Sequence, residues 1–362
     1  MMGSIIAQSQ APMQFEKETL RPAAFNTGPD FHLLDHIAPL ADLMQMPLIT
    51  TEEKNFELAQ THYPQIQTIL EPDLEFKLGA ISEKFDILFE CKYWPAHLKQ
   101  LFFDLYKKKM RLVFCPHGQS DKGFEAPLLA PYSQQDVVLL YGDLLIDMLK
   151  ELSLWPYISN YVLIGNYRLQ FYRKYQSFQD ALAEKKVFAF LDSKKPTLLY
   201  APTWKDADQS TSFFEYGPAI FSHLPEDWNL IVKVHPLLEQ RDPAHFYSVA
   251  ALVDKKPGAI LVSDFPFIYP LIARSSAYLG DFSSVGYDCL ALNRPLFFLP
   301  TPRPGRLHSC GTILNPRNDF HLLFEPNIYQ EKQKTLSMLA FGPARPAAII
   351  REEILKTCSN RN

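Results

Sequence analysis

Asp281, Ser283 and Ser284 follow directly on the apolar run YLG and precede a short helical pattern and a second apolar run. A helix that begins here would direct backbone N–H groups outward, beside two hydroxyls and the positive end of the helix dipole. This arrangement predicts an anion site, with phosphate as the natural ligand. Either serine would also suit a helix N-cap. We expect Asp281 at the site without a defined role, and Asp288 either supports the serines or faces solvent.

Two other apolar runs are followed by polar residues, in TLLYAPTWKD at 197–206 and in NLIVKVHP at 229–236. The carboxyl ends of parallel strands meet at one edge of a sheet, where ligands bind. The Thr203 hydroxyl and the Lys205 ammonium suit phosphate oxygens, and Lys233 adds a second cation. His235 either neutralises charge on a pyrophosphate leaving group or only caps the strand end.

The segment RLVFCPHGQSDKG at 111–123 presents His117 after another apolar run. Gly118 lets the backbone turn tightly and brings a ligand close. An imidazole here titrates near neutral pH and suits accepting a proton from a hydroxyl. The alternative is a loop histidine bonded to the backbone.

In their order and spacing, YAPTWKD, VKVHP and DFSS resemble the C-terminal half of the CDP-glycerol glycerophosphotransferases, the polymerases of teichoic acid. The segment with His117 and Gly118 is similar to the family's strand ending in His-Gly, with Lys122 as the lysine that follows. The resemblance covers about 90–310 and is absent from 1–85. It implies that His117 is the general base, that the donor is CDP-activated, and that transfer needs no metal or other cofactor.

Composition limits the other function classes. A net charge of −4 and a pI near 6.2 argue against nucleic-acid binding. Five scattered cysteines predict neither disulfides nor a zinc site, and neither a signal peptide nor a membrane span is visible. We therefore expect a cytoplasmic protein, with possible peripheral membrane contact through the basic stretch at 102–111.

Two spacings have a metal-binding alternative that we discount. His32 and His36 would share one helical face, but no third ligand is evident, so surface or packing histidines are favoured. Asp206 and Asp208 form an Asp-x-Asp sequence, but the secondary-structure element before it is not the one that precedes a metal-binding Asp-x-Asp motif. The predicted metal ligands are therefore none.

Alternation of apolar runs with helical spacers, recognisable from about residue 84, predicts an α/β fold with two Rossmann-like parallel-sheet domains facing a cleft, the GT-B architecture. The predicted divisions are an irregular lead (1–30), an acceptor-side domain (31–180), a nucleotide-donor domain (181–328) and a helical tail that packs back on the first domain (329–362).

The sequence thus predicts a transferase that moves glycerophosphate, or a related polyol phosphate, from a CDP-activated donor to a hydroxyl of a glycan, lipid-linked or polymer acceptor. One alternative on the same fold is a nucleotide-sugar glycosyltransferase or a UDP-sugar 2-epimerase. A second is a non-catalytic nucleotide- or partner-binding domain, which the intact His117 and His235 argue against.

Overall fold

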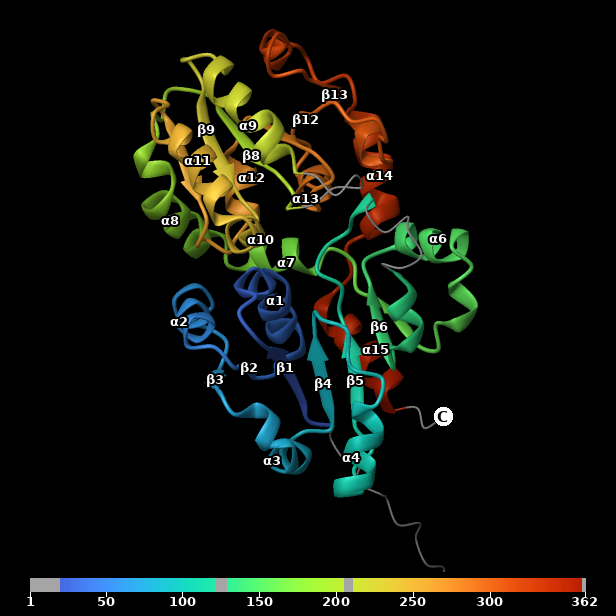
Figure 1. Ribbon diagram of the computed structural model, residues 1–362. Coiled ribbons are helices and arrows are strands. Elements are labelled where there is room, and N and C mark those ends of the chain that lie inside the picture. Colours follow the sequence, from blue (N-terminus) through green and yellow to red (C-terminus); the bar gives the residue numbers. More distant parts are fainter. Residues whose placement is uncertain (1–19, 122–128, 205–210, 360–362) are drawn as a thin grey trace, which may run out of the picture.

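The computed structural model describes residues 20–121, 129–204 and 211–359. Within these residues the chain forms two fully parallel sheets covered by helices (Figure 1). The first has the strand order β3-β2-β1-β4-β5-β6-β7 and the second β10-β9-β8-β11-β12-β13. The predicted α/β fold with two parallel sheets is confirmed.

The strands of the first sheet are β1 (Pro22–Asn26), β2 (Leu48–Thr50), β3 (Thr68–Leu70), β4 (Ile87–Glu90), β5 (Arg111–Phe114), β6 (Val137–Leu140) and β7 (Tyr161–Leu163). Those of the second are β8 (Thr197–Ala201), β9 (Asn229–Lys233), β10 (Ala259–Val262), β11 (Ala277–Gly280), β12 (Leu296–Phe298) and β13 (Thr312–Ile313). Most are predominantly apolar, because helices cover both faces of a parallel sheet.

The α-helices among the described residues are α1 (Leu34–Met44), α2 (Glu53–His62), α3 (Leu78–Lys84), α4 (Leu98–Tyr106), α6 (Asp143–Glu151), α7 (Tyr167–Lys174), α8 (Gln176–Lys186), α9 (Ser212–His223), α10 (Pro236–Arg241), α11 (Pro243–Val253), α12 (Tyr269–Arg274), α13 (Val285–Leu290), α14 (Gln330–Phe341) and α15 (Ala347–Ser359).

The irregular lead predicted for 1–30 is wrong where the structure describes it, because 22–26 form β1 in the interior of the first sheet. The predicted alternation from about 84 also missed β2 and β3. Each of these two strands has only three residues, and β1 is the short run PAAFN, so none gives a clear apolar period.

The two sheets share a hydrophobic core. One buried cluster extends from the first sheet to the inward side of the second, where Leu199, Ile231 and Tyr278 belong to it. Helices α7 and α8 follow β7 and lead into β8, while α15 lies against β7 and α1. Because this buried cluster contains residues of both sheets, it packs the two sheets against each other.

Candidate active site

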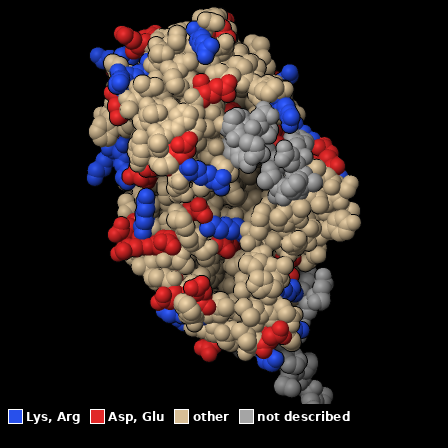
Figure 2. All heavy atoms as spheres, in the orientation of Figure 1, with Lys and Arg blue, Asp and Glu red and all other residues tan. Residues whose placement is uncertain are grey.

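A cleft lies between the two sheets, and both contribute to its walls. Of the predicted residues, His117 comes from the first sheet and Lys233, His235, Ser283, Ser284 and Asp288 come from the second. Four further polar residues that line it were not predicted as site residues: His32, Asp35, His36 and Arg168. The cleft therefore combines an imidazole on one side with a cation and hydroxyls on the other. Figure 2 shows acidic and basic side chains interspersed over one face of the molecule, without an extended area of one sign.

His117 follows β5 in a loop that Tyr141 holds in place. The Tyr141 hydroxyl donates to the Pro116 carbonyl at 3.0 Å and accepts from the Gly118 N–H at 3.2 Å. His117 Nδ1 lies 3.4 Å from the Cys91 carbonyl oxygen. Donation to a carbonyl requires the proton on Nδ1, which places the imidazole lone pair on Nε2. This tautomer suits a general base.

Gly118 brings this loop against the second sheet. Its φ is +108°, and a Cβ at this position would lie 2.8 Å from the Cβ of Ser284. Further along the loop, Tyr287 Oη donates to Asp121 at 2.6 Å, and Asp121 also accepts from the Leu307 N–H at 2.9 Å. The His117 loop thus approaches the second half of the chain closely at Gly118 and is bonded to it at Asp121.

Lys233 and His235 occupy the end of β9. Burial lowers the pKa of Lys233 to about 8, opposed by the charges of Asp35 and Asp264. His235 is the N-cap of α10, and its Nδ1 accepts from the Leu237 N–H at 3.2 Å. Helix capping and a site in the cleft are therefore compatible. With Nδ1 accepting, a neutral His235 carries its proton on Nε2, where it is a donor.

Asp281 lies behind the cleft and organises its loops. Its carboxylate accepts from the backbone N–H groups of Thr203 and Ser283, at 3.0 and 3.1 Å, and from the Ser212 hydroxyl at 2.6 Å. Thr203 is buried and does not line the cleft. Asp281 thus joins the loop after β8 to the loop after β11, which presents Ser283 and Ser284. Its bond to the Ser283 N–H holds the backbone of that serine in place.

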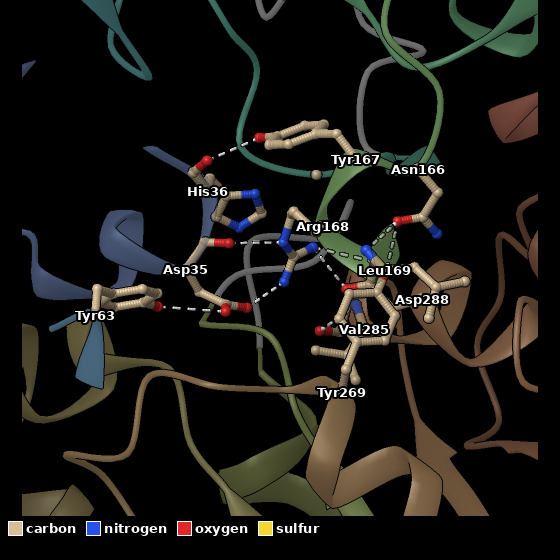
Figure 3. Close-up of polar contacts among 12 residues, drawn as sticks. Asp35, His36, Tyr63, Asn166, Tyr167, Arg168, Leu169, Tyr269, Val285 and Asp288 are labelled. Atoms are coloured by element: carbon tan, nitrogen blue, oxygen red, sulfur yellow. Dashed lines mark hydrogen bonds and ion pairs between the residues drawn. The ribbon is translucent and has the colours of Figure 1, made fainter. Parts of the chain in front are cut away.

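Arg168 was missed by sequence reasoning, and it ties the two sheets together. It lies on α7, and its guanidinium bonds to Asp35 on α1 and to Asp288 on α13 (Figure 3). Nη1 reaches the two Asp288 oxygens at 3.1 and 2.9 Å, Nε donates to the Asp35 carbonyl at 2.8 Å, and Nη2 donates to the Asp35 carboxylate. The Tyr269 hydroxyl also donates to Asp288, at 2.9 Å. Asp288 is therefore a buried partner of Arg168 and does not face solvent.

The charges of this cluster depend on one another. Arg168 is 4% exposed and its pKa stays well above its usual range because both aspartates face it, although burial opposes this. Burial raises the pKa of Asp35 to about 6, against the effect of Arg168. We name Asp35, Arg168 and Asp288 the buried triad. Arg168 in the helical stretch YRLQFYRK gave no signal of the triad, since both of its partners are distant in sequence.

His32 and His36 also point toward the cleft, from the 3-10 turn η1 (Phe31–Leu33) and from α1. The centroid of the His32 ring lies 4.6 Å from that of His235 and 6.3 Å from that of His117. His36 Nδ1 lies 3.3 Å from the Tyr141 hydroxyl. His32 packs against His235, as the prediction of a packing histidine allows, but it also lines the cleft. Only a fold that brings residues 32, 117 and 235 together reveals the group.

Several predicted residues cannot be placed. Lys122, Lys205, Asp206 and Asp208 lie outside the described residues. Among those described, no group of three or more His, Cys, Asp or Glu side chains has the geometry to hold a metal ion. Nor does that part of the chain contain a helix with the length and apolarity needed to cross a membrane.

Comparison with known proteins bears on the second half of the cleft. Residues 173–301 match the sequence model of the CDP-Glycerol:Poly(glycerophosphate) glycerophosphotransferase family. The predicted resemblance is confirmed. A teichoic acid poly(glycerol phosphate) polymerase from Staphylococcus epidermidis is 28% identical over 126 residues. That alignment covers 33% of this chain and only 16% of the polymerase, so the chain matches a small part of its relative's length.

Solved structures extend the likeness to almost the whole fold. The wall teichoic acid polymerase TagF aligns with a TM-score of 0.63 at 16% identity, over 93% of this chain and 88% of that one. A UDP-GlcNAc 2-epimerase from Neisseria meningitidis aligns with a TM-score of 0.59 at 15% identity, over 93% and 99% of the two chains. The fold is thus GT-B-like, and transferases and epimerases share it. Only the family match separates these two classes.

Proposed function

We propose that this protein transfers glycerophosphate, or a related polyol phosphate, from a CDP-activated donor to a hydroxyl of a glycan, lipid-linked or polymer acceptor. The observation that carries the proposal is one cleft in which His117 of the first sheet faces Lys233, His235 and Ser283 of the second. The last three lie in the segment that matches the glycerophosphotransferase family.

In the proposed reaction the acceptor hydroxyl attacks the phosphorus that carries the polyol. The new P–O bond forms as the bond to the pyrophosphate bridging oxygen breaks, and CMP leaves. The hydroxyl proton passes to Nε2 of His117, whose Nδ1 faces the Cys91 carbonyl. Positioning and charge stabilisation account for most of the acceleration in such transfers.

The second sheet would stabilise the leaving group. Lys233 supplies positive charge, His235 supplies a donor at Nε2, and the hydroxyls of Ser283 and Ser284 lie beside them. Lys205 would add a further cation from outside the described residues. No step requires a metal ion or another cofactor, so we propose metal-independent transfer.

We also propose a cytoplasmic location with contact at the membrane surface, where a lipid-linked acceptor would lie. Helix α4 exposes Phe103, Leu105 and Tyr106, which are 39%, 60% and 41% exposed, directly before Lys107 and Lys108. Exposed apolar side chains next to basic ones suit an anionic bilayer surface.

The first test is thermal stabilisation by CDP-glycerol, CDP-ribitol, CMP and UDP-GlcNAc at matched concentrations, since a ligand of the folded state raises the melting temperature. A shift confined to cytidine nucleotides supports the proposal. A shift with UDP-GlcNAc alone contradicts it and favours the epimerase or glycosyltransferase class. His117→Ala should then abolish CMP release while the CDP-glycerol shift persists, and wild-type turnover in that variant would refute the base assignment.

A further inference from the structure

His32 lies close to both histidines to which the proposed reaction gives roles. Its ring centroid is 4.6 Å from that of His235, which is proposed to serve the leaving group, and 6.3 Å from that of His117, which is proposed to serve the acceptor. An in-line transfer places the phosphorus and its polyol between attacking and leaving oxygens. A side chain close to both the base and the leaving-group donor is therefore well placed to contact the transferred unit.

The hydrogen bonding of His32 is incomplete. Its Nδ1 is buried and has no hydrogen-bond partner among the described residues. The corresponding atoms of neighbouring histidines are engaged: Nδ1 of His36 faces the Tyr141 hydroxyl, and Nδ1 of His235 accepts from a backbone N–H. A buried polar atom without a partner is uncommon and requires an explanation. Here the atom belongs to a residue whose ring lines the cleft, so a substrate that enters the cleft and shifts this ring can supply the missing partner.

The chemistry of His32 selects among the groups of the donor. Burial and the nearby His117 and Lys233 lower its pKa to about 4, although Asp30 opposes this, so the ring is neutral at physiological pH. A neutral imidazole has one donor and one acceptor, as a hydroxyl does, whereas phosphate oxygens only accept. In the proposed reaction, Lys233 and the serines bind the anionic oxygens of the donor. The group left for His32 to bind is then a hydroxyl of the polyol.

We infer that His32 is a specificity-determining residue whose Nδ1 hydrogen-bonds a hydroxyl of the transferred polyol phosphate. The inference rests on the proposed function, because it takes the CDP-polyol as the substrate. It adds a residue outside the family-matched segment and assigns it to the polyol end of the donor. Since Nδ1 has no protein partner, replacing the ring with an apolar side chain removes no intramolecular hydrogen bond at that atom.

The test is calorimetric binding of CMP, CDP-glycerol and CDP-propanol, which lacks both free glycerol hydroxyls, to wild type, His32→Leu and His32→Asn. We expect His32→Leu to weaken CDP-glycerol about tenfold and to leave CMP within about twofold, because one hydrogen bond is lost at the polyol alone. His32→Asn, whose amide overlies Nδ1, should recover most of the affinity. CDP-propanol should bind wild type and His32→Leu equally.

His62→Leu is the control for the loss of a buried histidine, since His62 is 1% exposed, packs against Phe265 and Phe267, and is not among the residues that line the cleft. It should bind all three nucleotides as wild type does. Equal loss of CMP and CDP-glycerol in His32→Leu would indicate a structural role and overturn the inference. If His32→Leu does not fold, the wild-type protein alone provides the test. Equal affinity of wild type for CDP-glycerol and CDP-propanol would then overturn the inference. Wild type that binds no cytidine nucleotide would refute the proposed function and the inference together, whereas unchanged CDP-glycerol affinity in His32→Leu would refute the inference alone.

Discussion

Replacing Arg168 by methionine tests whether the buried triad holds the two sheets together. Met retains much of the stem of Arg168 but removes the guanidinium, which leaves the carboxylates of Asp35 and Asp288 buried without their cation. The exposed fractions of these two side chains are 10% and 6%, so water does not replace the lost partner. Breaking a buried ion pair from one side costs about 3–5 kcal/mol. A loss of that size is a large part of the 5–15 kcal/mol typical of a folded domain.

The loss should depend on pH with a definite sign. The pKa of Asp35 is raised from 3.8 to about 6 in the folded protein, so the folded state binds more protons than the unfolded state between these values. Stability from this group therefore falls as pH rises through that window. Without Arg168, which lowers the Asp35 pKa, the window extends to higher pH. Arg168→Met should thus lose more stability at pH 8 than at pH 5.

Urea unfolding at both pH values measures this, and Lys174→Met is the matched control. Lys174 lies on the same helix and pairs with Asp42, but its side chain is 57% exposed, so its loss should cost at most about 1 kcal/mol. The combined variant Arg168→Met, Asp35→Asn, Asp288→Asn should recover most of the loss, because no buried charge remains. A cost under 1 kcal/mol for Arg168→Met at pH 8, or a larger cost at pH 5, would refute the reasoning.

Three further outcomes are expected. Burial raises the pKa of Glu90 from 4.5 to about 7, so the contribution of this carboxyl group to stability falls as pH rises through that range. In thermal unfolding, Glu90→Gln should therefore stabilise the protein by about 1–3 kcal/mol at pH 8 but not at pH 4.5. Glu57 is exposed, so the control variant Glu57→Gln should leave the stability unchanged at both pH values. Equal effects of Glu90→Gln at pH 8 and pH 4.5 would contradict the burial argument. Because the pKa of Lys233 is about 8, the affinity of the wild-type protein for CMP should weaken as pH rises through 8. Lys233→Arg should abolish this pH dependence, since arginine stays charged. If the variant retained the pH dependence, a group other than Lys233 would be its cause. Gly118→Ala should reduce turnover at least tenfold, because the new Cβ would lie 2.8 Å from the Cβ of Ser284 and the φ of Gly118 is positive. A wild-type kcat/KM in this variant would show that the close approach of Gly118 to Ser284 is not needed.

The second sheet was more predictable than the first, for a physical reason. Several of its site residues stand at or just after the end of a strand, so a short segment contains both the apolar run and the polar residue that it positions. Ser283, Lys233 and His235 are of this kind, and the cleft contains all three. Asp281 has the same sequence signature but a different role, because its carboxylate is turned back onto the loop of Thr203. A sequence pattern places a residue at a strand end without fixing the direction of its side chain.

The residues that escaped prediction depend on contacts between distant segments. Arg168 and Asp288 are 120 positions apart, and Arg168 and Asp35 are 133 apart. His32 follows β1, whose sequence PAAFN is bounded by a proline and an asparagine and contains two alanines, so neither the strand nor a place for His32 in the cleft was predicted. The roles of Lys122 and Lys205, which lie outside the described residues, stay predictions.

The placement of Arg168 suggests why a connecting helix carries a buried charge at all. Hydrophobic contacts alone hold surfaces together without specifying one orientation, whereas the triad requires α1, α7 and α13 to meet at fixed points. Helix α1 follows directly on His32, and α13 follows directly on Ser283 and Ser284, so the same contacts fix the distance across the cleft. If this is its function, Arg168→Met with both aspartates neutralised should be as stable as wild type and still transfer poorly, with kcat reduced more than CMP affinity. Wild-type kcat in that stable variant would show that the hydrophobic core alone sets the width of the cleft.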